Sequence, residues 1–319
     1  MNLFKTFMSL LHADHGSSLV SQRREAFSLP FNPPLNTPIL YDHERRLQRQ
    51  GQVQTQRSTE QFIWSAARDG FVLHWVTTAF EFQAAEPMQG LMNGIGTSLL
   101  NKPVLLAVTP DGSISDLINL DKVRCQHRAA IAAMGDRIAT LFADQPALTQ
   151  DSMAASIAGM LSQIDAQSDA QFVDSHLQGL RLLLCEAGPL PAGEDIALLA
   201  ALPALVGEGL IRTDLTARLE LNAARTWARF RIASVADPTD AATAAGPIVA
   251  AALKAIADPD ARRKAESLLD DLSPPEIADE LVQLFDLPSG LAKRSDYRRS
   301  IKISGMPPRL ETRKFRRRD

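Results

Sequence analysis

Arginine and lysine residues in the C-terminal third are the side chains of this sequence best placed to do chemistry. Arg225, Arg229 and Arg231 occupy odd-numbered positions of one segment and therefore share a face of a strand. A second basic group lies near the end of the chain and consists of Arg313, Lys314, Arg316, Arg317 and Arg318. Clustered guanidinium and ammonium groups bind phosphates and other anions. These eight residues are the candidate anion-binding site.

The same residues make the distribution of charge uneven. The whole chain carries 34 Lys and Arg against 37 Asp and Glu, a formal net charge of -3. Between residues 293 and 319, by contrast, eleven basic residues stand against three acidic ones. A mildly acidic body therefore ends in a basic segment. This asymmetry is typical of contact with a polyanion or an anionic membrane surface, and equally of a solvated terminus.

Patterns for catalysis, metals and cofactors are missing. The segment 174–176 contains Asp, Ser and His, but successive side chains on a helix point about 100° apart and cannot converge as a triad. Asp42 and Glu44 share a strand face as a glycosidase pair would, although neighbouring arginines favour a solvated sheet edge. The chain has neither a P-loop nor a zinc spacing. We therefore predict no catalytic residue, metal or cofactor, and a binding protein rather than an enzyme.

The cysteines and the N-terminus leave two questions open. Cys125 and Cys185 lie in apolar patterns far apart in the sequence, so they are either buried thiols or partners in a disulfide. Residues 7–11 form an apolar run shorter than the ~7 to 15 residues of an export-signal core, and we expect 1–26 to be a flexible segment. No run of about 18 apolar residues predicts a membrane-spanning helix.

The periodicity of apolar residues predicts the elements that must position these side chains. Alternation with period two predicts strands within 27–119 and 211–235 and a terminal strand within 297–305. A period of 3.6 predicts a helical insertion at 120–210, which includes an apolar helix at 196–206. The remaining expectations are a loop at 90–96, helices over 240–288 with a capping box at 273–276, and a basic tail at 306–319.

Together these elements predict an α+β fold. With 45% hydrophobic residues the chain is able to bury a sizeable core. We expect a single domain at 27–305, in which a curved antiparallel sheet carries helices packed on one face and a helical insertion separates two strand groups. The alternative is an all-α domain at 120–210 inserted into a β domain.

Three segments of the first 125 residues resemble uncharacterised bacterial proteins of unknown function, usually made with an export signal. They are the proline-rich stretch 27–38 that leads into Tyr41, the aromatic strand ending at 76–80, and the turn segment 108–116. The resemblance implies a location in the bacterial envelope or periplasm, whereas an N-terminus intact as given implies the cytoplasm. It implies no catalytic residues.

Three hypotheses of function follow. The first is a non-enzymatic protein that holds a hydrophobic small molecule or lipid under the sheet, in the layout of lipoprotein carriers, because 196–206 is more apolar than a surface helix requires. The second is a module that binds a polyanion or an anionic membrane surface through the basic tail and the arginine strand. The third is a hydrolase with a site assembled from dispersed residues. The sequence leaves the ligand and the oligomeric state open.

Overall fold

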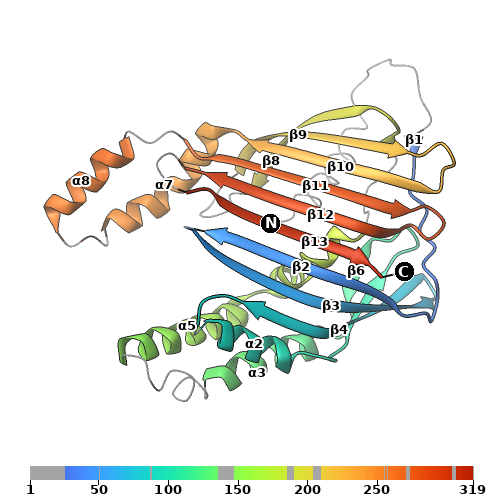
Figure 1. The fold of residues 1–319 in the computed structure, drawn as a ribbon, viewed down its shortest axis with the longest axis horizontal. Coiled ribbons are helices and arrows are strands. Elements are labelled where there is room, and N and C mark those ends of the chain that lie inside the picture. The colour runs from blue at the N-terminus through green and yellow to red at the C-terminus, as the bar shows by residue number, and fades with distance from the viewer. Residues whose placement is uncertain are drawn as a thin grey trace.

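The computed structural model describes residues 26–318, apart from 50, 87, 136–146, 185–189, 204–209, 255, 257, 271–273 and 304–306. The described residues form a large antiparallel sheet with helices, which confirms the α+β class (Figure 1). The sheet is not strongly curled, so the predicted curvature is not confirmed.

Eleven described strands form the main sheet, in the order β6-β5-β4-β3-β2-β13-β12-β11-β10-β9-β8. The N-terminal strands are β2 (Ile39–Arg49), β3 (Gln52–Ala67), β4 (Gly70–Gln83), β5 (Val104–Val108) and β6 (Ile114–Leu117). The C-terminal strands are β8 (Asp195–Pro203), β9 (Leu210–Leu221), β10 (Trp227–Ala236), β11 (Glu276–Asp286), β12 (Leu291–Lys302) and β13 (Arg309–Arg317). Because β13 pairs with β2, the ends of the chain join the two halves in the centre of the sheet (Figure 1).

Helices accompany both halves. In sequence order they are α2 (Met88–Ser98), α3 (Leu120–Gly135), α5 (Ala147–Ala166), α6 (Asp169–Leu177), α7 (Pro238–Lys254) and α8 (Pro259–Asp270). The N-terminus of α6 is fixed by a reciprocal capping box between Ser168 and Gln171. A 3-10 turn at Leu180–Leu182 and a two-stranded sheet of β1 (Ala26–Phe27) and β7 (Leu190–Pro191) complete the fold. None of the described helices is both long and apolar enough to cross a bilayer.

The two faces of the main sheet differ in burial. We call the side that bears Tyr41, Phe230 and Phe315 the covered face, because all three side chains are buried there. The opposite side, which bears Glu44 and Arg229, is the open face. Strand β10 follows the predicted alternation, with Ala228, Phe230 and Ile232 fully buried and the intervening Arg229 and Arg231 exposed. Each large apolar side chain on the covered face contributes roughly 1.5 to 3 kcal/mol by burial.

Two predicted helices are strands in the structure. Residues 195–203 form β8, which pairs with β9, and residues 276–286 form β11 between β10 and β12. A short, wholly apolar run fits a buried helix and a strand equally well, which explains the first error. In β11 the buried side chains are Asp279, Leu281, Gln283 and Phe285, a period of two that pairing with both neighbours enforces.

Three further expectations change. The predicted basic tail at 306–319 is largely strand β13, which lies at the centre of the sheet. The predicted terminal strand at 297–305 is therefore not the last strand, and its residues 297–302 are the second part of β12. The expected loop at 90–96 lies within α2, where Gly96 lets the helix approach the ring of Phe80 more closely than a Cβ would allow. Strand β2, expected at an edge because of its charges, is central.

The remaining expectations are confirmed in part or concern residues outside the described ranges. Among the described residues, helices α3, α5, α6, α7 and α8 confirm helical segments within 120–135, 147–177, 238–254 and 259–270. The expected flexible segment 1–26 lies outside the described residues except for Ala26 in β1. The side chain of Cys125 is exposed, so the expectation of a buried thiol is wrong for this residue, and because Cys185 lies outside the described residues the pairing of the two stays a prediction.

Candidate functional site

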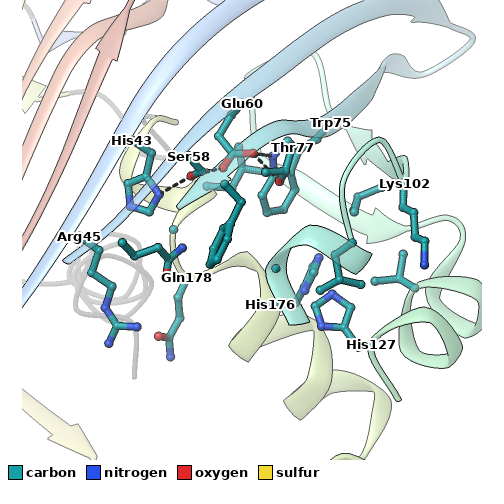
Figure 2. A pocket seen from close by; sticks show the side chains of 18 of the residues that line it. His43, Arg45, Ser58, Glu60, Trp75, Thr77, Lys102, His127, His176 and Gln178 are labelled. Atoms are coloured by element: carbon teal, nitrogen blue, oxygen red, sulfur yellow. Dashed lines mark hydrogen bonds between the residues drawn. The ribbon is translucent and has the colours of Figure 1, made fainter. Parts of the chain in front are cut away.

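A pocket of about 450 Å³ lies between the covered face of the sheet, at β13 and the N-terminal strands, and the helices that face it (Figure 2). Its floor comes from β13, β2, β3, β4 and the start of β5, and α3 and residues 175–180 face it from the helical side. The volume falls in the usual range for small-molecule sites. The described residues therefore enclose space for a ligand of moderate size.

Strand register arranges the floor in rows. One row places Arg313, Arg45 and Gln56 side by side, and the next places Phe315, His43, Ser58 and Phe80 together. Two residues further along the strands come Glu60 and Thr77, and then Phe62, Trp75 and Val104. Successive rows are roughly 7 Å apart because only alternate residues face the same side. The floor thus changes from cationic at one end to apolar at the other.

Glu60 lies in the middle of the floor and is only 5% exposed. Ser58 Oγ donates to its Oε1 at 2.6 Å, while Trp75 Nε1 and Thr77 Oγ1 donate to its Oε2, both at 2.8 Å. Among the described residues no Lys or Arg forms an ion pair with this carboxylate. A buried carboxylate needs such donors to offset the loss of its hydration.

The hydrogen-bond directions around Glu60 determine the tautomer of His43. Because Ser58 donates its only proton to Glu60, its oxygen accepts from Nδ1 of His43, which lies 3.2 Å away. Nε2 of His43 then carries a lone pair, and this buried atom has no partner among the described residues. The ring stacks on Phe315 with centroids 4.1 Å apart.

Burial also keeps His43 neutral. Loss of hydration, with the adjacent charges of Arg313 and Arg45, lowers the pKa of His43 to about 3. Nε2 of this neutral imidazole can therefore accept a hydrogen bond, and His43 is one of the residues that line the pocket.

Two more histidines line the other end of the pocket, near Lys102 (Figure 2). Burial, with a contribution from His127, lowers the pKa of His176 to about 3, and burial with the charge of Lys102 lowers the pKa of His127. The rings of His127 and His176 meet edge to face at 4.8 Å, and His176 also stacks on Phe172. In the described part of the chain, no group of three or more potential ligands could hold a metal.

Arg45 and Arg313 form the cationic end of the pocket and share one carboxylate. Nε of each donates to Oε1 of Glu311 at 2.9 Å, and Nη2 of Arg313 lies 2.9 Å from the same oxygen. The side chain of Glu311 is 9% exposed, against 38% for the side chain of Arg45. Adjacent cations hold the pKa of Glu311 below its usual range despite burial. One buried anion thus faces two guanidinium groups.

The predicted anion-binding residues do not assemble into one site. Of the eight, Arg313 lines the pocket, whereas Arg229, Arg231, Lys314 and Arg316 belong to the open face. Most of these pair with acidic neighbours, as in Arg231 with Glu280 and Arg316 with Asp296. Arg318 pairs with Asp42, and Arg225 lies in the β9–β10 turn with a positive φ of 48°. Arg317 follows the covered side, near enough to Tyr41 to influence its pKa.

The other candidate catalytic residues from the sequence, in 174–176 and at Asp42 and Glu44, have different partners and do not form a shared site. Ser175 Oγ donates to the carbonyl of Phe172, and Asp174 pairs with Arg181, so segment 174–176 forms no triad among the described contacts. On the open face Asp42 binds Arg318 and Glu44 binds Arg57. These contacts satisfy the carboxylates as surface ion pairs.

Sequence reasoning missed Ser58, Glu60 and Arg45. A signal for two of them exists, because Ser58 and Glu60 precede Phe62 and Trp64 on the same face of one strand. Polar residues on an otherwise apolar strand face predict either an open edge or a buried polar site. His43 and Arg313 lie beside them because β13 pairs with β2 and β2 with β3. β13 and β2 are far apart in the sequence, and the local pattern of residues gives no information about such a pairing.

No protein-family model matches the chain, and no curated protein matches it either. The resemblance to uncharacterised bacterial proteins therefore stays a prediction.

Proposed function

We propose that the protein binds a small amphipathic molecule in the pocket between the covered face and α3 and α6. The observation that carries the proposal is the lining itself: a buried hydrogen-bonded carboxylate, Glu60, lies between a cationic row and an apolar row. Ligand sites combine apolar walls with a few convergent polar groups in this way. Nε2 of His43 and Nε2 of His176 add two buried polar atoms without a partner among the described residues.

This proposal refines the expectation of a hydrophobic ligand held under a curved sheet. Phe62, Phe80, Val104 and Leu180 supply apolar contacts, as that hypothesis requires. A purely apolar ligand, however, would leave Nε2 of His43 and Nε2 of His176 without a partner, which costs roughly 1 to 3 kcal/mol for each buried group, and would make no use of the guanidinium groups. A ligand with both a polar and an apolar part fits the lining better.

Binding is favoured over hydrolysis by the direction of one hydrogen bond. A serine nucleophile gives its proton to a histidine base. Ser58 instead donates to Glu60, and His43 contacts it through Nδ1, the nitrogen that carries the proton. The arrangement supports a fixed recognition surface.

The hypothesis that the basic tail binds a polyanion loses its main support, because the segment is largely strand β13 and several of its basic side chains form ion pairs with carboxylates of the same chain. Its residues alternate between the two faces of the sheet, and Arg313 and Arg316, together with Arg318 just after the strand, contact carboxylates. Binding to a polyanion with a steep salt dependence requires several cations that neutralise its phosphates, and these side chains already have carboxylate partners.

The proposal is tested by titrating the protein with N-phenyl-1-naphthylamine, an uncharged dye that fluoresces in apolar sites. We expect saturable binding of one dye per chain. Gln126→Trp on α3 fills the pocket and should weaken binding by about tenfold or more, equivalent to about 1.4 kcal/mol. The matched control, Ala129→Trp, places the same ring at an exposed position of α3 and should leave the affinity unchanged.

Two results contradict the proposal. One is the absence of saturable binding, by the folded wild-type protein, of both this dye and a dye of the same skeleton that carries a negative charge, with folding checked by near-ultraviolet circular dichroism. The other is equal binding by the wild-type protein and a folded Gln126→Trp variant, which would place the dye elsewhere.

A further inference from the structure

We infer that the ligand of this pocket is an amphipathic anion, whose carboxylate, sulfonate or phosphate group binds Arg45 and Arg313 while its apolar body extends toward Phe62 and Val104. The inference rests on the proposed function and adds the chemical class of the ligand. It starts from the shared carboxylate of Glu311 and from the order of the rows on the pocket floor.

The guanidinium groups retain unused donors on the pocket side. Glu311 takes up Nε of Arg45 and both Nε and Nη2 of Arg313. The described residues provide no partner for Nη1 and Nη2 of Arg45 or for Nη1 of Arg313. Planar guanidinium groups bind carboxylate and phosphate oxygens through pairs of such donors. The two side chains can therefore receive a second anion beside Glu311.

The charge balance favours the same ligand. Arg45, Arg313 and Lys102 line the pocket against one lining carboxylate, Glu60. Glu311 neutralises one of the two arginines, so this end keeps an excess positive charge in a partly buried place. Burial and the proximity of Arg45 lower the pKa of Arg313, which is the direction expected for an under-compensated cation.

The position of the cationic row determines how such a ligand lies. Arg45 is one row from His43 and three rows from Phe62 along β2 and β3, a span of roughly 20 Å. Figure 2 shows Arg45 and His43 at one end, Glu60 between, and Trp75 and Lys102 toward the other. When the anionic group of the ligand binds Arg45, the rest of the ligand extends from there along the floor toward its apolar end. Glu60 and His43 can accept hydrogen bonds from polar substituents on the way.

A pair of dyes with one aromatic skeleton isolates the charge. 1-Anilinonaphthalene-8-sulfonate differs from N-phenyl-1-naphthylamine by a sulfonate group. We expect the sulfonate dye to bind about tenfold more tightly, the contribution of a charge-assisted hydrogen bond. Raising NaCl from about 50 to 500 mM should weaken only the sulfonate dye, because screening acts on charge. Energy transfer from Trp75, reduced in Trp75→Phe, reports that each dye occupies the pocket.

The variants test the assignment to Arg45. Arg45→Gln should reduce the affinity for the sulfonate dye by about tenfold and leave the neutral dye within about twofold. Lys314→Gln removes the same charge from an exposed side chain on the open face and should change neither. If circular dichroism shows that Arg45→Gln is unfolded, Arg45→Lys, which keeps the charge but loses the planar donors, replaces it. The salt dependence of sulfonate binding by the wild-type protein then tests the role of charge.

The outcomes separate the two proposals. Equal affinity for the two dyes, or an equal loss of both in folded Arg45→Gln, overturns the anion assignment and leaves the binding function standing. Saturable binding of neither dye overturns both. Tighter, salt-sensitive binding of the sulfonate dye that depends on Arg45 and not on Lys314 supports the anion assignment.

Discussion

The covered and open faces of the sheet contain the same types of charged residue in different surroundings. On the open face Arg57 pairs with Glu44 and Arg316 with Asp296, and all four side chains keep contact with water. On the covered face Arg299 binds Asp279, which is 5% exposed, and Arg45 and Arg313 share Glu311. Successive residues of one strand, such as Arg313 and Lys314, belong to opposite faces. The number of basic residues in a segment therefore says little about its function until the face is known.

The difference between the faces is one of solvation. An exposed ion pair contributes about 0 to 1 kcal/mol, because water and salt screen it and its side chains lose conformational freedom. A buried charge without its partner costs several times more, since it has lost its hydration. Charges retained on the covered face consequently mark either a structural network or a binding site. The Asp279 cluster, with Tyr297 Oη and Arg299 both donating to it, is satisfied internally, whereas Arg45 faces the pocket.

Acidification should produce the largest difference between the faces. His43 and His176 have a folded pKa of about 3, below their ordinary value near 6.5, so the unfolded chain binds more protons between these values. Their stabilisation is full above about pH 6.5 and is lost as the pH falls. At pH 5 the loss is about 2 kcal/mol for each histidine.

Urea unfolding at a series of pH values measures this loss. His43→Phe, which preserves a ring against Phe315, should reduce the slope of unfolding free energy against pH in this window by about one linked proton. A slope unchanged by the substitution would show that His43 is not buried in its neutral form.

Removal of one carboxylate from each face should give the next largest contrast. Glu311→Gln leaves Arg45 and Arg313 without their shared anion and should lower the free energy of unfolding by about 3 kcal/mol. Glu44→Gln makes the same chemical change on the open face and should cost at most about 1 kcal/mol. Denaturant unfolding of both variants at pH 7 checks the prediction. Equal losses would mean that the two faces are equally solvated.

A pair of glycines gives the smallest contrast. Gly96 in α2 packs against the ring of Phe80, a residue of the pocket, while Gly159 in α5 has open space around it. Gly96→Ala should destabilise the protein by about 1 kcal/mol and weaken binding of the neutral dye, because Phe80 must move. Gly159→Ala should stabilise it by up to about 1 kcal/mol through helix propensity. Thermal unfolding and dye titration measure both, and unchanged dye binding in Gly96→Ala would separate Phe80 from the site.

The elements that could be predicted from the sequence are those whose apolar residues recur with only one period, either two or 3.6. The alternation in 215–221 and 226–232 predicted strands and their buried residues, and the 3.6-residue stripe at 120–134 predicted α3. Segments 196–206 and 276–285 were predicted as helices because their apolar residues fit both periods, and pairing with neighbouring strands decided between them. The candidate site was less predictable. Of the eight predicted anion-binding residues only Arg313 lines the pocket, and its partner Arg45 lies near the other end of the chain.

The sequence by itself determined the alternation of 39–46, and hence that His43 and Arg45 share a face, whereas it predicted the segment of Arg313 and Phe315 as a tail and not as strand β13. It also determined the excess of basic residues near the C-terminus. Only the tertiary structure decided that these two strands pair in the centre of the sheet and that helices cover the face bearing Arg45. The physical reason is that burial depends on contacts between segments distant in the chain. Those contacts make one arginine a solvated surface charge and another a candidate ligand-binding group.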